Sequence, residues 1–294
     1  MTTESSFVKD PLLPHLLDIL EHTAAASLML TGGFGLNLKR HVLLQVQADT
    51  VIDPSDWPNV RATQDLDFIL KMSVFTERQR ADDVANLLKN LGYKVDWRNL
   101  QFSKPLLPGM DDPRVVVDLI SRMPTPSENV KSDGTRVGIG KGSPVHGRAT
   151  AEAFAVERSP RALLVSGIDT AGMEVEAEVL VPHPFAWLNM KIRAAHEWYE
   201  EREGRLDTRK KPRSPKHAFD VMLIAAMMTL DERQSASLLA QEFRDHPEAM
   251  KIREEAKMLF SLPTSPGWIE ARRQTGRELD HSAIWETLAR TLGI

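Results

Sequence analysis

The sequence predicts an α+β fold followed by a helical C-terminal domain. Short apolar segments and amphipathic helices fill roughly the first 180 residues, whereas the segments after Pro182-His183-Pro184 have apolar residues at spacings of three and four. The length of 294 residues favours about two domains. We therefore expect an α+β domain over residues 1–182 and a helical domain over residues 183–294.

Each predicted element of the first domain follows from the spacing of apolar residues and from the glycine and proline residues that interrupt it. Pro11 precedes leucines at helical spacing, which predicts a helix over Pro11–His22. A short apolar run, Ala25–Leu30, ends at Thr31-Gly32-Gly33. The further predicted elements are a helix over 36–46, a loop over 49–59, a strand over 66–70, a helix over 76–91, strands over 94–97 and 115–120, a loop or hairpin over 124–147, and strands over 162–168 and 173–181.

The second domain is predicted to consist of helices only. A polar linker, Glu203–Ser214, contains Gly204 and Pro212 and separates the first helix from the others. The predicted helices are 185–201, 215–229, 231–244, 247–260 and 282–292.

Charge and composition exclude several classes of protein. With Lys+Arg 37 and Asp+Glu 41, the net charge is −4, which excludes a polycation that binds nucleic acid over its whole surface. The absence of cysteine excludes disulfides, thiolate zinc sites and cysteine nucleophiles. The N-terminal sequence lacks the pattern of a signal peptide, and the most apolar runs are shorter than the about 20 residues that span a bilayer. We expect a cytoplasmic protein with no membrane partner.

Three aspartates are candidate metal ligands. Asp65 and Asp67 lie two residues apart on a predicted strand, so their carboxylates share one face. Like charges this close raise each other's pKa unless a cation lies between them, and oxygen ligands suit Mg²⁺. Asp118 is the acid within the apolar strand 115–120. The alternatives are a chance Asp-x-Asp triplet and an Asp118 at the solvated end of an edge strand.

Glycine and basic residues supply candidate phosphate ligands. Thr31-Gly32-Gly33 precedes a helix, and a helix N-terminus offers free N–H groups to a phosphate. Lys191 lies in an apolar helical segment, where it either reaches solvent or points at phosphate. Lys216 and Asp220 are four apart on one helix face, which also suits an ordinary surface pair. The basic run 209–216 is either a solvated loop or a surface that binds the RNA backbone or a triphosphate.

Together these segments resemble the nucleotidyltransferase superfamily of the DNA polymerase beta type, and within it the AbiEii-type group, which includes toxins of bacterial toxin–antitoxin systems. The similar segments, in the family's order, are Thr31-Gly32-Gly33, Arg61-Ala62-Thr63-Gln64-Asp65-Leu66-Asp67, Asp118, Met190-Lys191-Ile192-Arg193-Ala194 and Lys216-His217-Ala218-Phe219-Asp220. They extend over residues 25–230. The resemblance implies a mixed sheet with flanking helices, followed by the helical domain.

The resemblance also implies an activity, namely Mg²⁺-dependent transfer of a nucleoside monophosphate from an NTP to RNA, to tRNA or to a protein hydroxyl. It implies that two Mg²⁺ ions bind Asp65, Asp67 and Asp118, that Lys191 neutralises phosphate charge, and that an antitoxin protein is the partner. The catalytic residues that it implies are Asp65, Asp67, Asp118, Lys191 and Asp220. The nucleotide-binding residues that it implies are Thr31, Gly32, Gly33, Arg61, Thr63, Lys191 and Lys216.

Two features depart from the family pattern. Phe34 follows the glycine pair, where the family often has a small or hydroxyl residue. The interval from Gly33 to Asp65 is longer than usual, and we assign the excess to the loop Asp49–Asn59. These departures keep open an inactive scaffold of the same fold that binds a protein or RNA. A further alternative, within enzymes, is a nucleotidyltransferase that modifies a small molecule such as an antibiotic.

Overall fold

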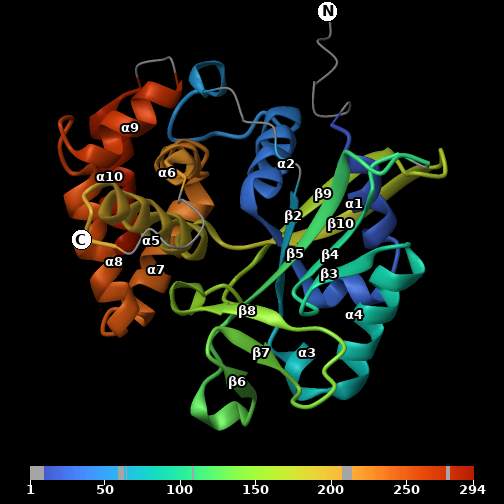
Figure 1. Ribbon diagram of the computed structural model, residues 1–294. Helices are drawn as coiled ribbons and strands as arrows, with labels where there is room; N and C mark the ends of the chain where they lie inside the picture. The colour runs from blue at the N-terminus through green and yellow to red at the C-terminus, as the bar shows by residue number, and fades with distance from the viewer. Residues whose placement is uncertain (1–9, 59–62, 64, 108, 207–213, 276–278) are drawn as a thin grey trace, which may run out of the picture. The chain divides into compact units, whose positions relative to one another are not determined.

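The computed structural model describes residues 10–58, 63, 65–107, 109–206, 214–275 and 279–294. The chain forms two compact units, which are drawn in Figure 1. The first comprises Met1–Val42 and Arg61–Pro182, and the second comprises Leu43–Val60 and His183–Ile294. All strands of the described residues belong to the first unit. The predicted α+β class with a mixed sheet is confirmed at this level.

An eight-stranded mixed sheet forms the centre of the first unit. Strand β5 pairs in parallel with β2, and in antiparallel fashion with β4 over residues 114–118. The order across the sheet is β1-β2-β5-β8-β7-β6, with β4 joining β5 to β3. The strands are β1 (Leu28–Thr31), β2 (Asp65–Leu70), β3 (Lys94–Trp97), β4 (Gln101–Pro105), β5 (Arg114–Arg122), β6 (Lys131–Asp133), β7 (Arg136–Gly138) and β8 (Gly147–Thr150).

A two-stranded hairpin and the helices α1 to α4 complete the described part of the first unit. The hairpin is β9 (Arg161–Ile168) with β10 (Glu174–Val181). It packs on α1 closely enough that a Cβ at Gly167 would lie 3.0 Å from Leu17 Cδ1. The helices are α1 (Leu13–Leu20), α2 (Gly32–Gln45), whose last turn belongs to the second unit, α3 (Ser73–Thr76) and α4 (Arg78–Asn90).

The second unit is helical around a central, fully apolar segment. Residues Val221–Met228, which form the second half of α6 and the two positions after it, are each at most 1% exposed. This segment is therefore the core of the unit rather than a surface helix. The helices are α5 (Pro184–Arg202), α6 (Lys216–Ala226), α7 (Leu230–Glu242), α8 (Pro247–Phe260), α9 (Pro266–Thr275) and α10 (His281–Leu292).

Residues 43–60 belong to the second unit, although their position in the sequence suggests the first domain. The reason is backbone pairing with the end of α6. Val51 N donates to Met228 O at 3.1 Å, and Ile52 N donates to Ala226 O at 3.1 Å. Trp57 is 1% exposed and donates from Nε1 to Ile52 O at 2.9 Å. These bonds attach the long segment before Asp65 to the helical unit.

Several elements differ from the sequence-based expectation. The structure adds strands β4 and β8 and the helix α9, and it resolves residues 124–147 into the short hairpin β6–β7. Helix α2 begins at Gly32, four residues earlier than expected. The strands concerned, β4, β6, β7 and β8, are only three to five residues long. Pairing with neighbouring strands therefore decides their conformation more than local periodicity does. No helix of the described residues is long and apolar enough to cross a membrane.

Candidate functional site

Four polar side chains form one row across the sheet. Thr31 on β1 lies opposite Asp67 on β2, Asp67 lies opposite Asp118 on β5, and Asp118 lies opposite Gln101 on β4. Residues paired in this way project from the same face of a sheet. The two acids, distant in sequence, are therefore direct neighbours on adjacent parallel strands.

Asp65 projects from the same face, one row away. It is two residues before Asp67 on β2 and lies opposite Val116, and residues i and i+2 of a strand are about 6.5–7 Å apart. The intervening residues Leu66 and Val117 are fully buried on the other face, whereas all three aspartates are half-buried. The sheet thus has an apolar face within the core and a partly open face that carries the acids.

Gly32 provides the space for the Asp67 carboxylate. A Cβ at Gly32 would stand 1.9 Å from Asp67 Oδ2 and 2.7 Å from its Cγ. The φ angle of Gly32 is +68°, which L-residues rarely adopt. Glycine is therefore required here by both backbone and neighbour. The sequence predicts a phosphate-binding glycine, and contact with the acidic strand is an additional constraint that only the fold reveals.

Gln101 and Thr31 complete the row of polar groups. Gln101 donates from Nε2 to Asp118 Oδ1 at 2.9 Å, which orients that carboxylate. Thr31 is 2% exposed, and its Oγ1 has no hydrogen-bond partner among the described residues. A buried hydroxyl without a partner is costly, and next to Asp67 it is available to a polar ligand. The sequence does not single out Gln101, because no local signal shows which strand lies beside β5.

Within the described residues, no three His, Asp or Glu side chains gather closely enough to form a metal-binding group. Asp65 is separated from the other acids by the row spacing, and like charges repel when no cation is present. Mg²⁺ often takes only one or two protein carboxylates together with substrate phosphates. The positions of Asp67 and Asp118 fit a Mg²⁺ ion of this kind, because the two carboxylates are neighbours and lie beside the unpartnered hydroxyl of Thr31.

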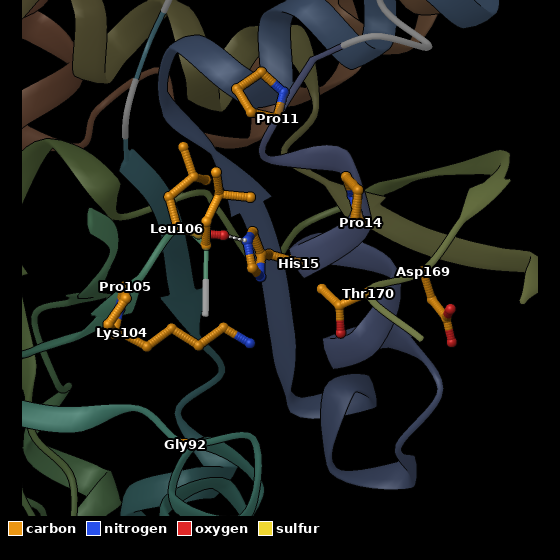
Figure 2. A pocket seen from close by; sticks show the side chains of 10 residues that line it. Pro11, Pro14, His15, Gly92, Lys104, Pro105, Leu106, Asp169 and Thr170 are labelled. Carbon is orange, nitrogen blue, oxygen red and sulfur yellow. Dashed lines mark hydrogen bonds between the residues drawn. The ribbon is translucent and has the colours of Figure 1, made fainter. Parts of the chain in front are cut away.

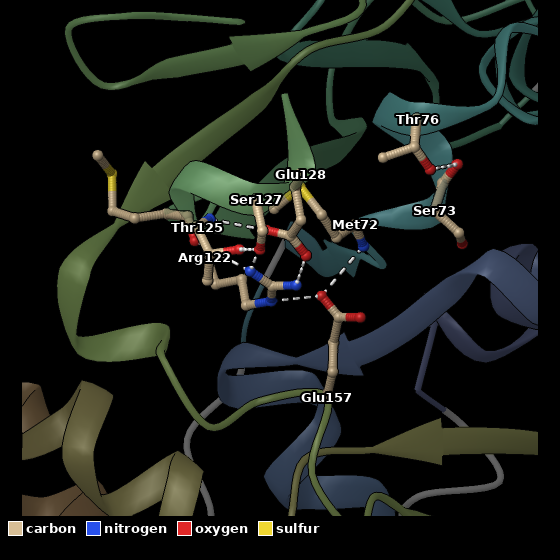
Figure 3. A network of polar contacts seen from close by, with 9 residues as sticks. Met72, Ser73, Thr76, Arg122, Thr125, Ser127, Glu128 and Glu157 are labelled. Carbon is tan, nitrogen blue, oxygen red and sulfur yellow. Dashed lines mark hydrogen bonds and ion pairs between the residues drawn. The ribbon is translucent and has the colours of Figure 1, made fainter. Parts of the chain in front are cut away.

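Glu157 ties together the ends of the two strands that carry the acids (Figure 3). Its Oε1 accepts from Met72 N at 3.0 Å, just after β2, and from Arg122 Nε at 2.8 Å, at the end of β5. Arg122 also donates to both carboxylate oxygens of Glu128, one of these bonds measuring 2.9 Å. This network fixes β2 against β5 beyond the acidic row.

Arg122 strongly perturbs Glu128. Its hydrogen bond, aided by the bond from Thr125 N, lowers the pKa of Glu128 to about 2, against the opposing effect of burial. Glu128 is therefore charged throughout the ordinary pH range. The capping box between Thr125 and Glu128 closes the turn after β5.

Lys191 and Asp220 form a buried ion pair within the second unit. Lys191 Nζ lies 2.6 Å from Asp220 Oδ2, and the two residues are 8% and 2% exposed. Burial raises the pKa of Asp220, but the charge of Lys191 and the hydrogen bonds from His217 and Lys191 together outweigh burial and hold the pKa below its ordinary value. His217 Nδ1 lies 3.6 Å from Asp220 Oδ2, and burial lowers the pKa of His217. Asp220 thus holds Lys191 in place.

The remaining predicted site residues have these positions. Gly33 is half-buried in the first turn of α2, and Phe34 beside it is fully buried. Thr63 accepts from Asp65 N at 3.4 Å through its Oγ1, and Lys216 is the first residue of α6. Arg61 and residues 209–213 of the basic run lie outside the described residues.

Comparison with known proteins does not identify the chain: no protein-family description matches it, and no curated protein matches it significantly.

Proposed function

We propose that this protein is a Mg²⁺-dependent nucleotidyltransferase, which moves a nucleoside monophosphate from an NTP to a hydroxyl acceptor and releases pyrophosphate. The observation that supports the proposal most is the parallel register of Asp67 and Asp118. It places two half-buried carboxylates side by side next to the glycine that begins α2.

The residues of this site would act in distinct ways. Asp67 and Asp118 would hold Mg²⁺, with Asp65 on the same face; the bound ion would lower the pKa of the acceptor hydroxyl and offset phosphate charge. The first turn of α2 leaves N–H groups that no helical carbonyl accepts, and these would bind phosphate oxygens. Gln101 would keep Asp118 in one orientation.

The sequence resemblance also implies a role for Lys191, a residue of the second unit. Lys191 would bind phosphate oxygens, and its ion pair with Asp220 would keep it charged and oriented. The acceptor that we favour is RNA, because the run from Arg209 to Lys216 contains five basic residues and no acid. A toxin whose activity an antitoxin protein restrains is the biological setting that the sequence resemblance suggests.

Transfer of labelled nucleotide tests this proposal. The purified chain is incubated with each of the four α-labelled NTPs, Mg²⁺ and total RNA, and label is sought in RNA and in the protein itself. Asp67→Asn and Asp118→Asn should each lower incorporation at least about 100-fold, because each removes a carboxylate that contributes several kcal/mol. Asp133→Asn, at an acid with a side chain that is 84% exposed, is the matched control and should act like the native chain.

An inactive scaffold is the second candidate, and one observation favours it. Phe34 is fully buried in the first turn of α2 and leaves no hydroxyl there for a phosphate. A scaffold predicts no label with any NTP and no heat of NTP binding in the presence of Mg²⁺. Two results would overturn the proposed activity: the native chain incorporates no labelled nucleotide, or Asp67→Asn incorporates as much as the native chain.

A further inference from the structure

A cavity of about 640 Å³ lies in the first unit. Its wall includes His15 on α1, Lys104 on β4 and Thr170 in the turn between β9 and β10. Lys104 is three residues after Gln101 on the same strand, so it projects from the opposite face to the row of acids. The cavity is therefore separate from the candidate site described above.

Most of the cavity wall is apolar. Figure 2 shows the imidazole of His15 near the centre of the lining residues, with Leu106 on one side and Thr170 on the other. Pro11, Pro14 and Pro105 add apolar rings that carry no N–H donor. An apolar wall of this size with a few polar groups is typical of a small-molecule site.

The charged groups beside the cavity already have partners within the protein. Lys104 Nζ lies 3.4 Å from Asp18 Oδ2 and donates to Leu91 O at 3.3 Å. Thr170 donates to Asp18 from its backbone N at 3.1 Å and from its Oγ1 at 2.9 Å. The ammonium and the carboxylate are therefore already paired. Asp169, the other charged residue of the lining, accepts from the N–H groups of its own turn, Ala171 N at 2.9 Å and Met173 N at 2.7 Å.

His15 is the exception to this internal pairing. It is 5% exposed, and its Nε2 lies 3.2 Å from Leu106 O. A carbonyl oxygen only accepts, so Nε2 carries the hydrogen. Burial, with the charge of Lys104, lowers the pKa of His15, so the ring is neutral and Nδ1 has a lone pair. Nδ1 has no hydrogen-bond partner in the described part of the chain.

We propose that this cavity binds an uncharged small molecule with an apolar body and one hydroxyl or N–H group, which donates to His15 Nδ1. The apolar wall selects the body of the ligand. The buried lone pair selects a donor and disfavours an ether or carbonyl of the same shape, because two acceptors would face each other.

A matched pair of probes tests the inference on the whole native chain. 2-Naphthol carries the hydroxyl donor, and 2-methoxynaphthalene has the same ring system without it. We expect 2-naphthol to bind about 3- to 10-fold more tightly, the range of one hydrogen bond, in a titration followed by NMR. The ¹⁵N resonance of His15 Nδ1 should move with 2-naphthol and stay unchanged with 2-methoxynaphthalene.

Two substitutions complete the test. His15→Leu removes both ring nitrogens and with them the Nδ1 acceptor, so the preference for 2-naphthol should disappear. His22→Leu, at an exposed histidine nearby in sequence, should keep the preference. Three results on the native chain would each overturn the proposal: neither probe binds, 2-naphthol and 2-methoxynaphthalene bind with equal affinity, or the Nδ1 resonance does not move with 2-naphthol. None of these three observations needs a variant, so the test does not depend on the folding of His15→Leu.

Discussion

Gln101 and Asp118 are directly paired across strands β4 and β5, and the amide of Gln101 donates to the carboxylate of Asp118 at 2.9 Å. This hydrogen bond holds the carboxylate of Asp118, a proposed metal ligand, in one orientation. The proposed activity would therefore depend on an uncharged residue that is not among the predicted metal ligands.

Replacement of Gln101 tests that dependence. Gln101→Leu should raise the Mg²⁺ concentration for half-maximal nucleotide transfer about 10-fold or more, because loss of a group that orients a ligand typically weakens metal affinity 10- to 100-fold. Gln79→Leu removes an exposed amide that bonds Asp83 on α4 and is the matched control. An unchanged Mg²⁺ dependence in Gln101→Leu would show that Gln101 has only a structural role.

Gly32→Ala should damage both stability and activity. The new methyl group would strike Asp67, and the positive φ would be strained. Gly142 has a φ of +74° with nothing within 4 Å of an added Cβ, so Gly142→Ala reports strain alone, about 1–2 kcal/mol. Gly32→Ala should cost about 1–3 kcal/mol more, by overpacking, as measured by urea unfolding. Equal losses for the two variants would contradict the contact with Asp67.

Breaking the Lys191–Asp220 pair should destabilise the second unit. Removal of one partner leaves a buried charge, so Lys191→Met or Asp220→Leu alone should cost about 3–5 kcal/mol. The double variant should cost less than either single change. Trp fluorescence during urea unfolding reports mainly this unit, because all but Trp97 of the six tryptophans belong to it. Additive losses would show that the pair contributes no coupling energy.

Glu128 makes stability depend on acid pH. Its pKa is about 2 in the folded chain, mainly through Arg122, against an ordinary 4.5. The unfolded chain thus takes up the proton first, and the stabilisation by Glu128 is lost as pH falls from about 4.5 towards about 2. Glu128→Gln should lower stability at pH 7 by about 1–2 kcal/mol, since the side chain is 23% exposed.

Melting temperatures by circular dichroism across this pH range check the prediction. The difference between the native chain and Glu128→Gln should shrink on acidification, while Asp133→Asn, at an exposed acid in the same unit, should track the native chain. A difference that stays constant down to pH 3 would show that Glu128 does not titrate as described.

Local sequence patterns predicted the long elements well. The leucines of α1 and the alternation in β5 report burial through their own spacing, and the change to all-helical structure after Pro182 is visible in composition. The strands β4 and β8 were not predicted, because segments of five and four residues carry too little periodicity. The assignment of residues 43–60 to the second unit was not predicted, because their hydrogen bonds to Ala226 and Met228 join distant parts of the chain.

The sequence by itself determined that Asp65 and Asp67 share one face of a strand, that Gly32 begins a helix after an apolar run, and that Lys191 lies in an apolar helix. These are consequences of side-chain period, which is local. Only the tertiary structure decided that Asp67 faces Asp118, that Gln101 orients Asp118, and that Asp220 neutralises Lys191. Strand register and helix packing depend on the burial of whole faces at once, and that information is spread over the entire chain.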